Sequence, residues 1–324
     1  MNRDAIVEKL ELRPGITDFA QAIDLKEMGL PTCADLDLMV AGMHVRVSFA
    51  ASWAPGVIHD CLSYWRLFVA KPNTSPPEFH LHLAPAAGAF IDPRHSFWNS
   101  ERPFLHHFEN DCGKWIAHRD FVALMGDHSC WAWLPTPTPD WSDSLDNLLA
   151  LCLRPVGEKK MAFLFHSAVI EHEKKAVLFF GPSGIGKSTL AKFSRDWGLR
   201  VMGSDQVYLR IEETRLLASA SPTCNPDIPR RESDWTTTDL EVKTVLALSR
   251  ALDPKQGPTF RVLETNNFIR RFFTEIFRDE SDLDFARAFS FALSVSALPK
   301  LVSGDFSYPY GDNFWPYLEQ LGYL

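Results

Sequence analysis

The chain has 324 residues, of which 46% are hydrophobic and 23% are charged, and it carries a formal net charge of −8 at pH 7. This composition provides a sizeable core for one large domain or two smaller ones, and the acidic balance argues against general binding to nucleic acid or acidic membranes. The N-terminus lacks a signal-peptide core and no stretch reaches the roughly 18 apolar residues of a membrane span, so we expect a cytoplasmic protein without membrane contact.

The first 140 residues predict a small β-rich domain. Short segments alternate between apolar and polar side chains, as half-buried strands do: residues 43–49, 79–83, 115–118, 121–125 and 129–134. A helical pattern covers residues 57–69, between the first two of these strands. Short strands separated by turn residues at this spacing predict an antiparallel arrangement.

One of these strands carries two histidines, His80 and His82, which share a face and could begin a metal site. No third ligand follows at a useful spacing, so solvated strand histidines are the favoured interpretation. The tryptophans of the same region favour packing in the core over a ligand cage.

Residues 135–143 are rich in Pro, Thr and Asp and predict a stiff, extended boundary between a domain of residues 1–140 and a second of residues 141–324. Beyond this boundary Leu145, Leu149 and Cys152 mark one face of a helix. We expect that helix to end at Pro155 and Gly157.

The second domain contains the Walker A pattern G-x-x-x-x-G-K-[ST] in every fixed position: Gly181-Pro182-Ser183-Gly184-Ile185-Gly186-Lys187-Ser188. An apolar run at residues 176–180 predicts a buried strand before it, and a helical pattern begins at Ser188. This context predicts a loop that binds a nucleoside triphosphate, and a turn of the same shape that binds no nucleotide is the alternative.

The glycines Gly181, Gly184 and Gly186 allow a tight turn with inward-pointing N–H groups, and the following helix adds its positive N-terminal end. We expect Lys187 to reach the β- and γ-phosphates and the Ser188 hydroxyl to ligate Mg²⁺. The predicted ATP site comprises residues 181–188 with Thr189.

Two polar residues flank this loop. Asp205 follows Lys187 by 18 residues, after one helix and a short strand, so we expect it beside the phosphates at the carboxyl edge of the sheet. Its carboxylate can hold Mg²⁺ or accept a hydroxyl proton there, and a solvated turn aspartate is the alternative. His166 precedes the lysine by 21 residues at the end of an apolar strand. We expect that strand to pair with the loop strand and bring the imidazole near the γ-phosphate, and a histidine buried for packing is the alternative.

Residues 212–242 are rich in Ser, Thr, Pro and charge and predict a long loop near the phosphate site, where Arg230 and Arg231 could bind phosphate or be solvated. Further patterns follow to the C-terminus: strands at residues 243–249 and 260–263, helices at residues 267–277 and 282–293, and an aromatic tail at residues 301–324 that we expect to pack.

Three segments of the second domain together resemble the catalytic domain of HPr kinase/phosphorylase: His166-Ser167-Ala168-Val169, residues 181–188, and residues 197–205. The resemblance implies a P-loop HPr-kinase/PEP-carboxykinase-like catalytic domain of the α/β class (α+β overall), preceded here by the β-rich domain. It also implies ATP and Mg²⁺ as cofactors and transfer of the γ-phosphoryl group to a serine hydroxyl of a protein or peptide. HPr kinases assemble as oligomers, so the resemblance allows a homo-oligomer.

The chain departs from the HPr-specific enzymes at three places. They carry two adjacent aspartates where this chain has Ser204-Asp205, they have Glu where it has Thr189, and their glycine-rich Glu-x-x-Gly signature has no counterpart here. These departures argue against HPr as the substrate and against the reverse phosphorylase reaction. They favour the wider group of HPr-kinase-related proteins, which includes kinases of lasso peptides.

Two other functions stay open at this point. A nucleotide-binding regulatory or scaffold protein without transfer activity is the first, because Ser204 leaves one carboxylate where the HPr-specific enzymes use two. A small-molecule kinase is the second, because nothing in the sequence indicates the size of the acceptor.

Overall fold

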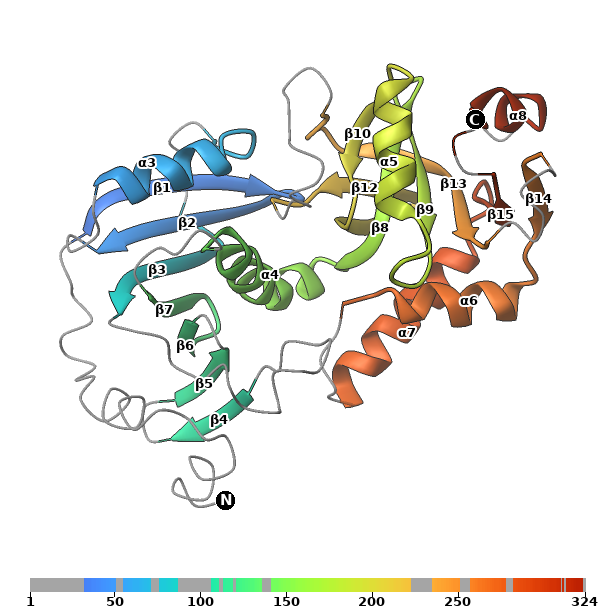
Figure 1. Cartoon of the computed structure of the whole chain (residues 1–324). Coiled ribbons are helices and arrows are strands. Elements are labelled where there is room, and N and C mark those ends of the chain that lie inside the picture. Colours follow the sequence, from blue (N-terminus) through green and yellow to red (C-terminus); the bar gives the residue numbers. More distant parts are fainter. Residues whose placement is uncertain are drawn as a thin grey trace, which may run out of the picture. The chain divides into compact units, whose positions relative to one another are not determined.

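A computed structural model describes the chain over residues 32–50, 55–70, 76–86, 106–110, 113–118, 121–135, 141–222, 235–250, 257–277, 282–309, 311 and 313–322. The chain divides into two compact units, Met1–Val156 and Gly157–Leu324, here called the N-terminal and C-terminal units (Figure 1). In the described residues each unit has one mixed sheet accompanied by helices, so the protein is a mixed α/β protein. None of the described helices combines the length and apolar character needed to cross a membrane.

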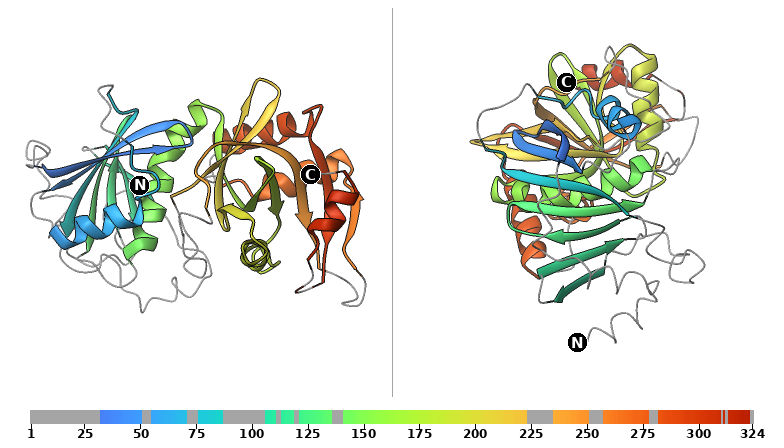
Figure 2. Two further views of the ribbon diagram at one scale, coloured as in Figure 1. Left: turned by 90° about the horizontal axis from the view of Figure 1, so that it is seen from above. Right: turned by 90° about the vertical axis from the view of Figure 1, so that its left-hand side faces the viewer.

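The N-terminal unit has a seven-stranded sheet in the order β1-β2-β3-β7-β6-β5-β4. Its strands are β1 (Thr32–Val40), β2 (Met43–Ala50), β3 (Phe79–Ala86), β4 (His106–Asn110), β5 (Gly113–His118), β6 (Phe121–Met125) and β7 (Ser129–Pro135). Its described helices are α3 (Pro55–Tyr64) and α4 (Trp141–Lys159), and α4 extends past the boundary into the C-terminal unit. The strand directions rotate gradually across the sheet, with the twist expected of L-amino acids (Figure 2).

The expectation of a purely antiparallel N-terminal sheet is wrong. β3 is parallel to both of its neighbours, β2 and β7. The reason is the connection: α3 crosses between β2 and β3, and a helical crossover brings the next strand back in the same direction.

The expected end of the helix at Pro155 is also wrong, because α4 continues to Lys159. Proline removes one backbone hydrogen bond from a helix interior. Buried Leu153 and Val156 continue the apolar face that Leu145 begins, and their burial offsets that loss. The division into two compact units falls after Val156, inside α4.

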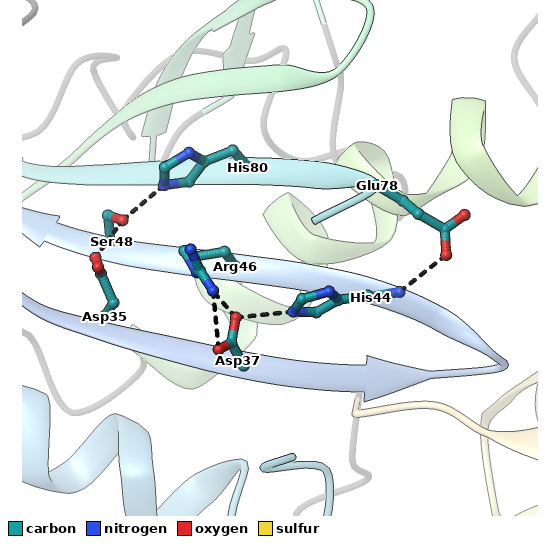
Figure 3. A network of polar contacts seen from close by, with 7 residues as sticks. All are labelled: Asp35, Asp37, His44, Arg46, Ser48, Glu78 and His80. Atoms are coloured by element: carbon teal, nitrogen blue, oxygen red, sulfur yellow. Dashed lines mark hydrogen bonds and ion pairs between the residues drawn. The ribbon is translucent and has the colours of Figure 1, made fainter. Parts of the chain in front are cut away.

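One face of the N-terminal sheet carries a polar network across β1, β2 and β3 (Figure 3). Asp37 Oδ1 accepts hydrogen bonds from His44 Nε2 at 2.8 Å and Arg46 Nε at 2.9 Å, and Oδ2 accepts one from Arg46 Nη2 at 3.1 Å. Burial opposes the charge on Asp37, but the hydrogen bonds from Arg46 and His44 outweigh it and lower the pKa of this carboxyl. We call these three residues the Asp37 cluster.

The two strand histidines lie beside this cluster and are half-buried, so the expectation of solvated side chains is wrong. The rings of His80 and His82 are 3.8 Å apart, and His82 stacks on Trp131 at 3.9 Å. Burial, followed by the neighbouring His80, lowers the pKa of His82 to about 4. His80 Nε2 also lies 2.6 Å from the Ser48 hydroxyl. Nowhere in the described parts of the chain do three His, Cys, Asp or Glu side chains converge as a metal site.

The described part of the C-terminal unit has eight strands: β8 (Ala162–His172), β9 (Lys175–Phe180), β10 (Arg200–Gly203), β11 (Gln206–Glu212), β12 (Arg215–Ala220), β13 (Leu240–Leu248), β14 (Thr259–Val262) and β15 (Val302–Ser307). Its helices are α5 (Lys187–Asp196), α6 (Thr265–Thr274), α7 (Asp282–Ser296) and α8 (Trp315–Gln320). The strand β12 corrects the expectation of one long loop over residues 212–242: Leu216 and Ala218 are buried, and β12 pairs with β11 as a hairpin. Arg230 and Arg231 lie outside the described residues.

The sheet of this unit places several strand ends at one edge. β9 is parallel to β13, β13 is parallel to β15, and both β9 and β10 run antiparallel to β8. The carboxyl ends of β9, β10, β13 and β15 therefore lie at the same edge, which is where ligands bind in sheets of this type.

Aromatic side chains fix β9 between two helical layers. Phe180 packs against Phe268 and Phe272 of α6, whereas Phe179, one residue earlier, contacts Phe314 and Trp315 on the opposite face. Successive side chains of a strand point to opposite faces, so both layers hold this strand in register. The loop that follows β9 therefore starts from a fixed point.

Candidate functional site

Residues 181–186 connect β9 to α5, and we call this segment the glycine loop. Gly181, Gly184 and Gly186 have φ values of 148°, 75° and 112°, which side-chain-bearing residues rarely adopt. A Cβ at Gly181 would also lie 3.3 Å from the Leu248 carbonyl oxygen. The backbone path of this loop thus depends on glycine at these positions.

The glycine loop ends at the N-terminus of α5. Gly186 is the N-cap of α5 and has no side chain to bond the first N–H groups of the helix. Ile185 N–H donates to the Pro182 carbonyl at 3.2 Å and closes the loop, and Thr189 lies in the first turn of α5. The uncapped helix start can accept an anion.

Lys187 is 5% exposed, and its ammonium group lies inside the loop. Nζ donates to the carbonyls of Gly181 and Pro182, the latter at 3.1 Å. Burial lowers the pKa of this lysine by more than the negative charges of Glu275 and Asp205 raise it, so the pKa lies below its ordinary value. Since its hydrogen-bond acceptors are neutral carbonyls, the ammonium can exchange them for phosphate oxygens without separating an ion pair.

The Ser188 hydroxyl donates to the Ser204 carbonyl at 3.3 Å, which places it next to Asp205. The Ser204 hydroxyl is buried, and no described residue forms a hydrogen bond with it. Mg²⁺ is usually held by one or two protein oxygens together with phosphate oxygens and water. The oxygens of Ser188 and Asp205 fit that requirement.

β8 changes its hydrogen-bonding partner at this edge of the sheet. Residues 162–166 pair with β11, and residues 167–172 pair with β9. At the change, His166 N–H donates to the Glu275 carbonyl at 2.8 Å and Ser167 N–H donates to the Asp205 carbonyl at 3.0 Å. Two segments distant in sequence are thereby fixed to consecutive residues of β8.

The side chains of these residues form a second set of contacts. His166 Nε2 lies 3.1 Å from Asp205 Oδ1, and His166 Nδ1 lies 3.1 Å from Glu275 Oε2. Burial opposes a charge on the imidazole, but the hydrogen bonds with Asp205 and Glu275 outweigh it and raise the pKa of His166. The Asp205 side chain is 46% exposed and that of Glu275 only 9% exposed. We call these three residues the His166 cluster.

Sequence reasoning missed Glu275, which lies 109 residues from His166. Its segment was interpreted only as an amphipathic helix. One local signal was present: Glu275 is the C-cap of α6, and a carboxylate at a helix C-terminus is unfavourable to the helix dipole. Such a residue indicates a compensating contact elsewhere in the fold.

Arg271, one turn earlier on α6, was missed as well. It donates to Asp305 Oδ1 at 3.0 Å and to the Leu248 carbonyl at 2.9 Å. The same Leu248 carbonyl lies beside Gly181, where it would be 3.3 Å from a Cβ added to that glycine. Through Arg271 and Glu275, α6 therefore supports both the end of β13 beside the glycine loop and the His166 cluster.

The structure brings together the sequence-predicted residues Lys187, Ser188, Asp205 and His166 beside the ends of β9 and β10. The expectation that His166 ends its strand is wrong, because β8 continues to His172, and residues 162–166 pair with β11 rather than with the loop strand β9. The site combines a buried ammonium, uncapped helix N–H groups, two oxygens suited to Mg²⁺ and a partly exposed carboxylate bonded to an imidazole. Chemically, such a set can bind a polyphosphate and accept a proton beside it.

No family model matches the chain, and no curated protein matches its sequence. Among solved structures, the chain is similar in part to the HPr(Ser) kinase/phosphatase of Coxiella burnetii. That match covers 49% of this chain and 87% of that chain, with 17% sequence identity and a TM-score of 0.30. A similarity at this TM-score carries no weight for fold or function, so the site is interpreted from its own geometry.

Proposed function

We propose that the protein is an ATP- and Mg²⁺-dependent kinase of the HPr-kinase type that transfers the γ-phosphoryl group to a hydroxyl of a protein or peptide. The observation that carries the proposal is the position of the Asp205–His166 pair beside a glycine loop that encloses Lys187. The preference for a serine hydroxyl comes from the sequence resemblance.

The glycine loop supports the binding of ATP. N–H groups of the loop and of the start of α5 would contact the β- and γ-phosphates, and Lys187 would turn from the loop carbonyls to phosphate oxygens. Bound Mg²⁺ would neutralise charge on the transferred phosphoryl group, with the Ser188 hydroxyl as a protein ligand. Asp205 would join it as a second ligand only where its free oxygen does not serve as the base.

The His166 cluster supports transfer to a hydroxyl. One oxygen of Asp205 faces His166, and the 46% exposure of the side chain leaves it accessible to an acceptor. In the transfer step the acceptor oxygen forms a bond to the γ-phosphorus, and the bond to the bridging oxygen of ADP breaks. The hydroxyl proton goes to Asp205, whose orientation His166 maintains.

A nucleotide-binding scaffold without transfer activity is the second candidate, and one observation favours it. Ser204 stands where the HPr-specific enzymes carry the first of two aspartates, and among the described residues its buried hydroxyl has no hydrogen-bond partner. If transfer required two carboxylates, this chain would bind ATP and Mg²⁺ without transferring the γ-phosphoryl group.

Incubation with γ-labelled ATP, Mg²⁺ and a cell extract separates the two candidates. A kinase labels an acceptor, and Lys187→Ala abolishes both ATP binding and labelling while the thermal unfolding of the protein stays cooperative. A scaffold binds ATP through Lys187 but labels nothing. Binding of ATP that survives Lys187→Ala would contradict both.

A further inference from the structure

We propose that Glu275 is a positioning residue that orients Asp205 through the imidazole of His166. The kinetic part of this inference rests on the proposed kinase function, whereas the structural part does not. Glu275 and His166 contact each other twice, once through the main chain at 2.8 Å and once through side chains at 3.1 Å. Two contacts between the same residues define both the place and the rotation of the ring.

The donor and acceptor roles of these groups show how Glu275 fixes the orientation of the His166 ring. A carboxylate can only accept, so the ring nitrogen that faces Glu275 must donate, and the same holds for the nitrogen that faces Asp205. With Nδ1–H committed to Glu275, the ring cannot turn over without losing a buried hydrogen bond. Nε2 is therefore kept toward Asp205.

The side chains of the His166 cluster differ in burial, and this difference assigns the positioning role to Glu275 and the reactive role to Asp205. The side chain of Glu275 is 9% exposed, that of His166 is 24% exposed and that of Asp205 is 46% exposed. A carboxylate that must meet an incoming hydroxyl needs exposure, and an exposed side chain is poorly ordered without a partner. The buried Glu275 supplies that order through His166.

Glu275 could also act by another route, because its charge raises the pKa of the Lys187 ammonium. Loss of Glu275 would then weaken the binding of ATP. The two routes make different predictions: an effect through His166 lowers kcat, whereas an effect through Lys187 raises the Kd for ATP.

The test combines Glu275→Ala and Glu275→Gln with His166→Ala in a double-mutant cycle. We expect Glu275→Ala to lower kcat by about 30-fold with the Kd for ATP within about threefold, because the ring loses its orientation. Glu275→Gln keeps an acceptor oxygen of the same size, so we expect a loss of only about fivefold. In the His166→Ala background neither change should lower kcat by more than about twofold.

The matched control is Glu264→Gln, the same substitution at the exposed N-cap of α6, which should leave kcat and the Kd for ATP unchanged. If Glu275→Ala lowered kcat by the same factor in the wild-type and the His166→Ala backgrounds, the inference would be overturned. A raised Kd for ATP with unchanged kcat would also overturn it. If Glu275→Ala does not fold, the Glu275→Gln arm of the cycle decides the question by the same criterion.

Nitrogen-15 NMR of the His166 ring decides the structural part without any turnover. We expect the wild type to show a hydrogen-bonded Nδ1–H, and Glu275→Ala to lose that hydrogen bond while Glu264→Gln keeps it. A ring signal unchanged by Glu275→Ala would overturn the inference even in an active kinase. Absence of transfer by the wild type would instead refute the proposed function and leave this measurement valid.

Discussion

The two units of the chain each pair a histidine with a carboxylate. The two clusters differ in how accessible that carboxylate is and in how many of its oxygens already accept hydrogen bonds. In the Asp37 cluster both carboxylate oxygens accept hydrogen bonds, and the side chain is 10% exposed. In the His166 cluster, the carboxylate of Asp205 faces one ring nitrogen and is 46% exposed. A saturated, buried carboxylate stabilises a fold, whereas an accessible one beside an anion-binding loop can take part in chemistry.

The position of each cluster in its sheet explains this difference. Asp37, His44 and Arg46 lie within strands, on the face opposite the buried Leu36, Leu38, Val45 and Val47. Their register, with Asp37 opposite Arg46, brings the charges together. Asp205 and Glu275 instead lie beyond the ends of β10 and α6, where the backbone turns and partners from distant segments converge.

The largest expected effect comes from Asp205→Asn, which keeps the size of the side chain and removes its charge. We expect transfer to fall by about a thousandfold, because a general base is lost, with little change in thermal stability. Rates of γ-phosphoryl transfer and a thermal melt measure the two quantities. An active Asp205→Asn variant would show that the contrast between the clusters has no catalytic meaning.

Gly186→Ala tests whether the glycine loop is what gives the His166 cluster its function. At φ 112° an alanine is strained, while its Cβ would lie at an ordinary 3.8 Å from the Tyr308 hydroxyl, so the backbone alone is perturbed. We expect ATP affinity to drop by about tenfold or more, because the strain costs roughly 1–2 kcal/mol and moves the start of α5.

Calorimetric titration with ATP measures that change in affinity. Gly56→Ala is the control, since Gly56 has no positive φ and open space around it, and it should leave ATP binding unchanged. Equal affinity of Gly186→Ala and wild type would mean that the loop does not hold the phosphates.

The local parts of this site could be predicted from the sequence. A strand, a glycine-rich turn and a helix follow one another within residues 175–196, so the pattern of apolar residues and glycines was sufficient. The approach of His166 and Asp205 was also predicted, although only Asp205 follows the end of a strand, and His166 lies inside β8.

The non-local parts could not be predicted. Glu275 and Arg271 reach the site only because α6 packs on Phe180, a tertiary contact with no short-range signal. The parallel pairing of β3 with β7 likewise depends on a return of the chain after three intervening strands. In α4, tertiary burial of Val156 outweighed the helix-breaking tendency of Pro155.

Asp37→Asn is the counterpart of Asp205→Asn in the N-terminal unit, and its effect should be on stability. Removing the charge leaves Arg46 and His44 without their carboxylate, which costs about 1–3 kcal/mol. We expect transfer to stay within about twofold of the wild type. Hydrogen exchange of the β1 and β2 amides measures the stability of this sheet without assuming that the whole chain unfolds in one step. A large loss of transfer would tie this cluster to the active site instead.

The smallest effect is the pH dependence of this same stabilisation. The pKa of Asp37 is lowered in the folded protein, so the folded state binds the proton less tightly than the unfolded chain, whose pKa is about 3.9. Its contribution is fully present above that value and is lost as the pH falls through the lower, folded pKa. The difference in sheet stability between wild type and Asp37→Asn should therefore be constant from about pH 5 to pH 8 and shrink below about pH 4. A difference that persisted at low pH would mean that Asp37 stabilises the sheet by packing rather than by charge.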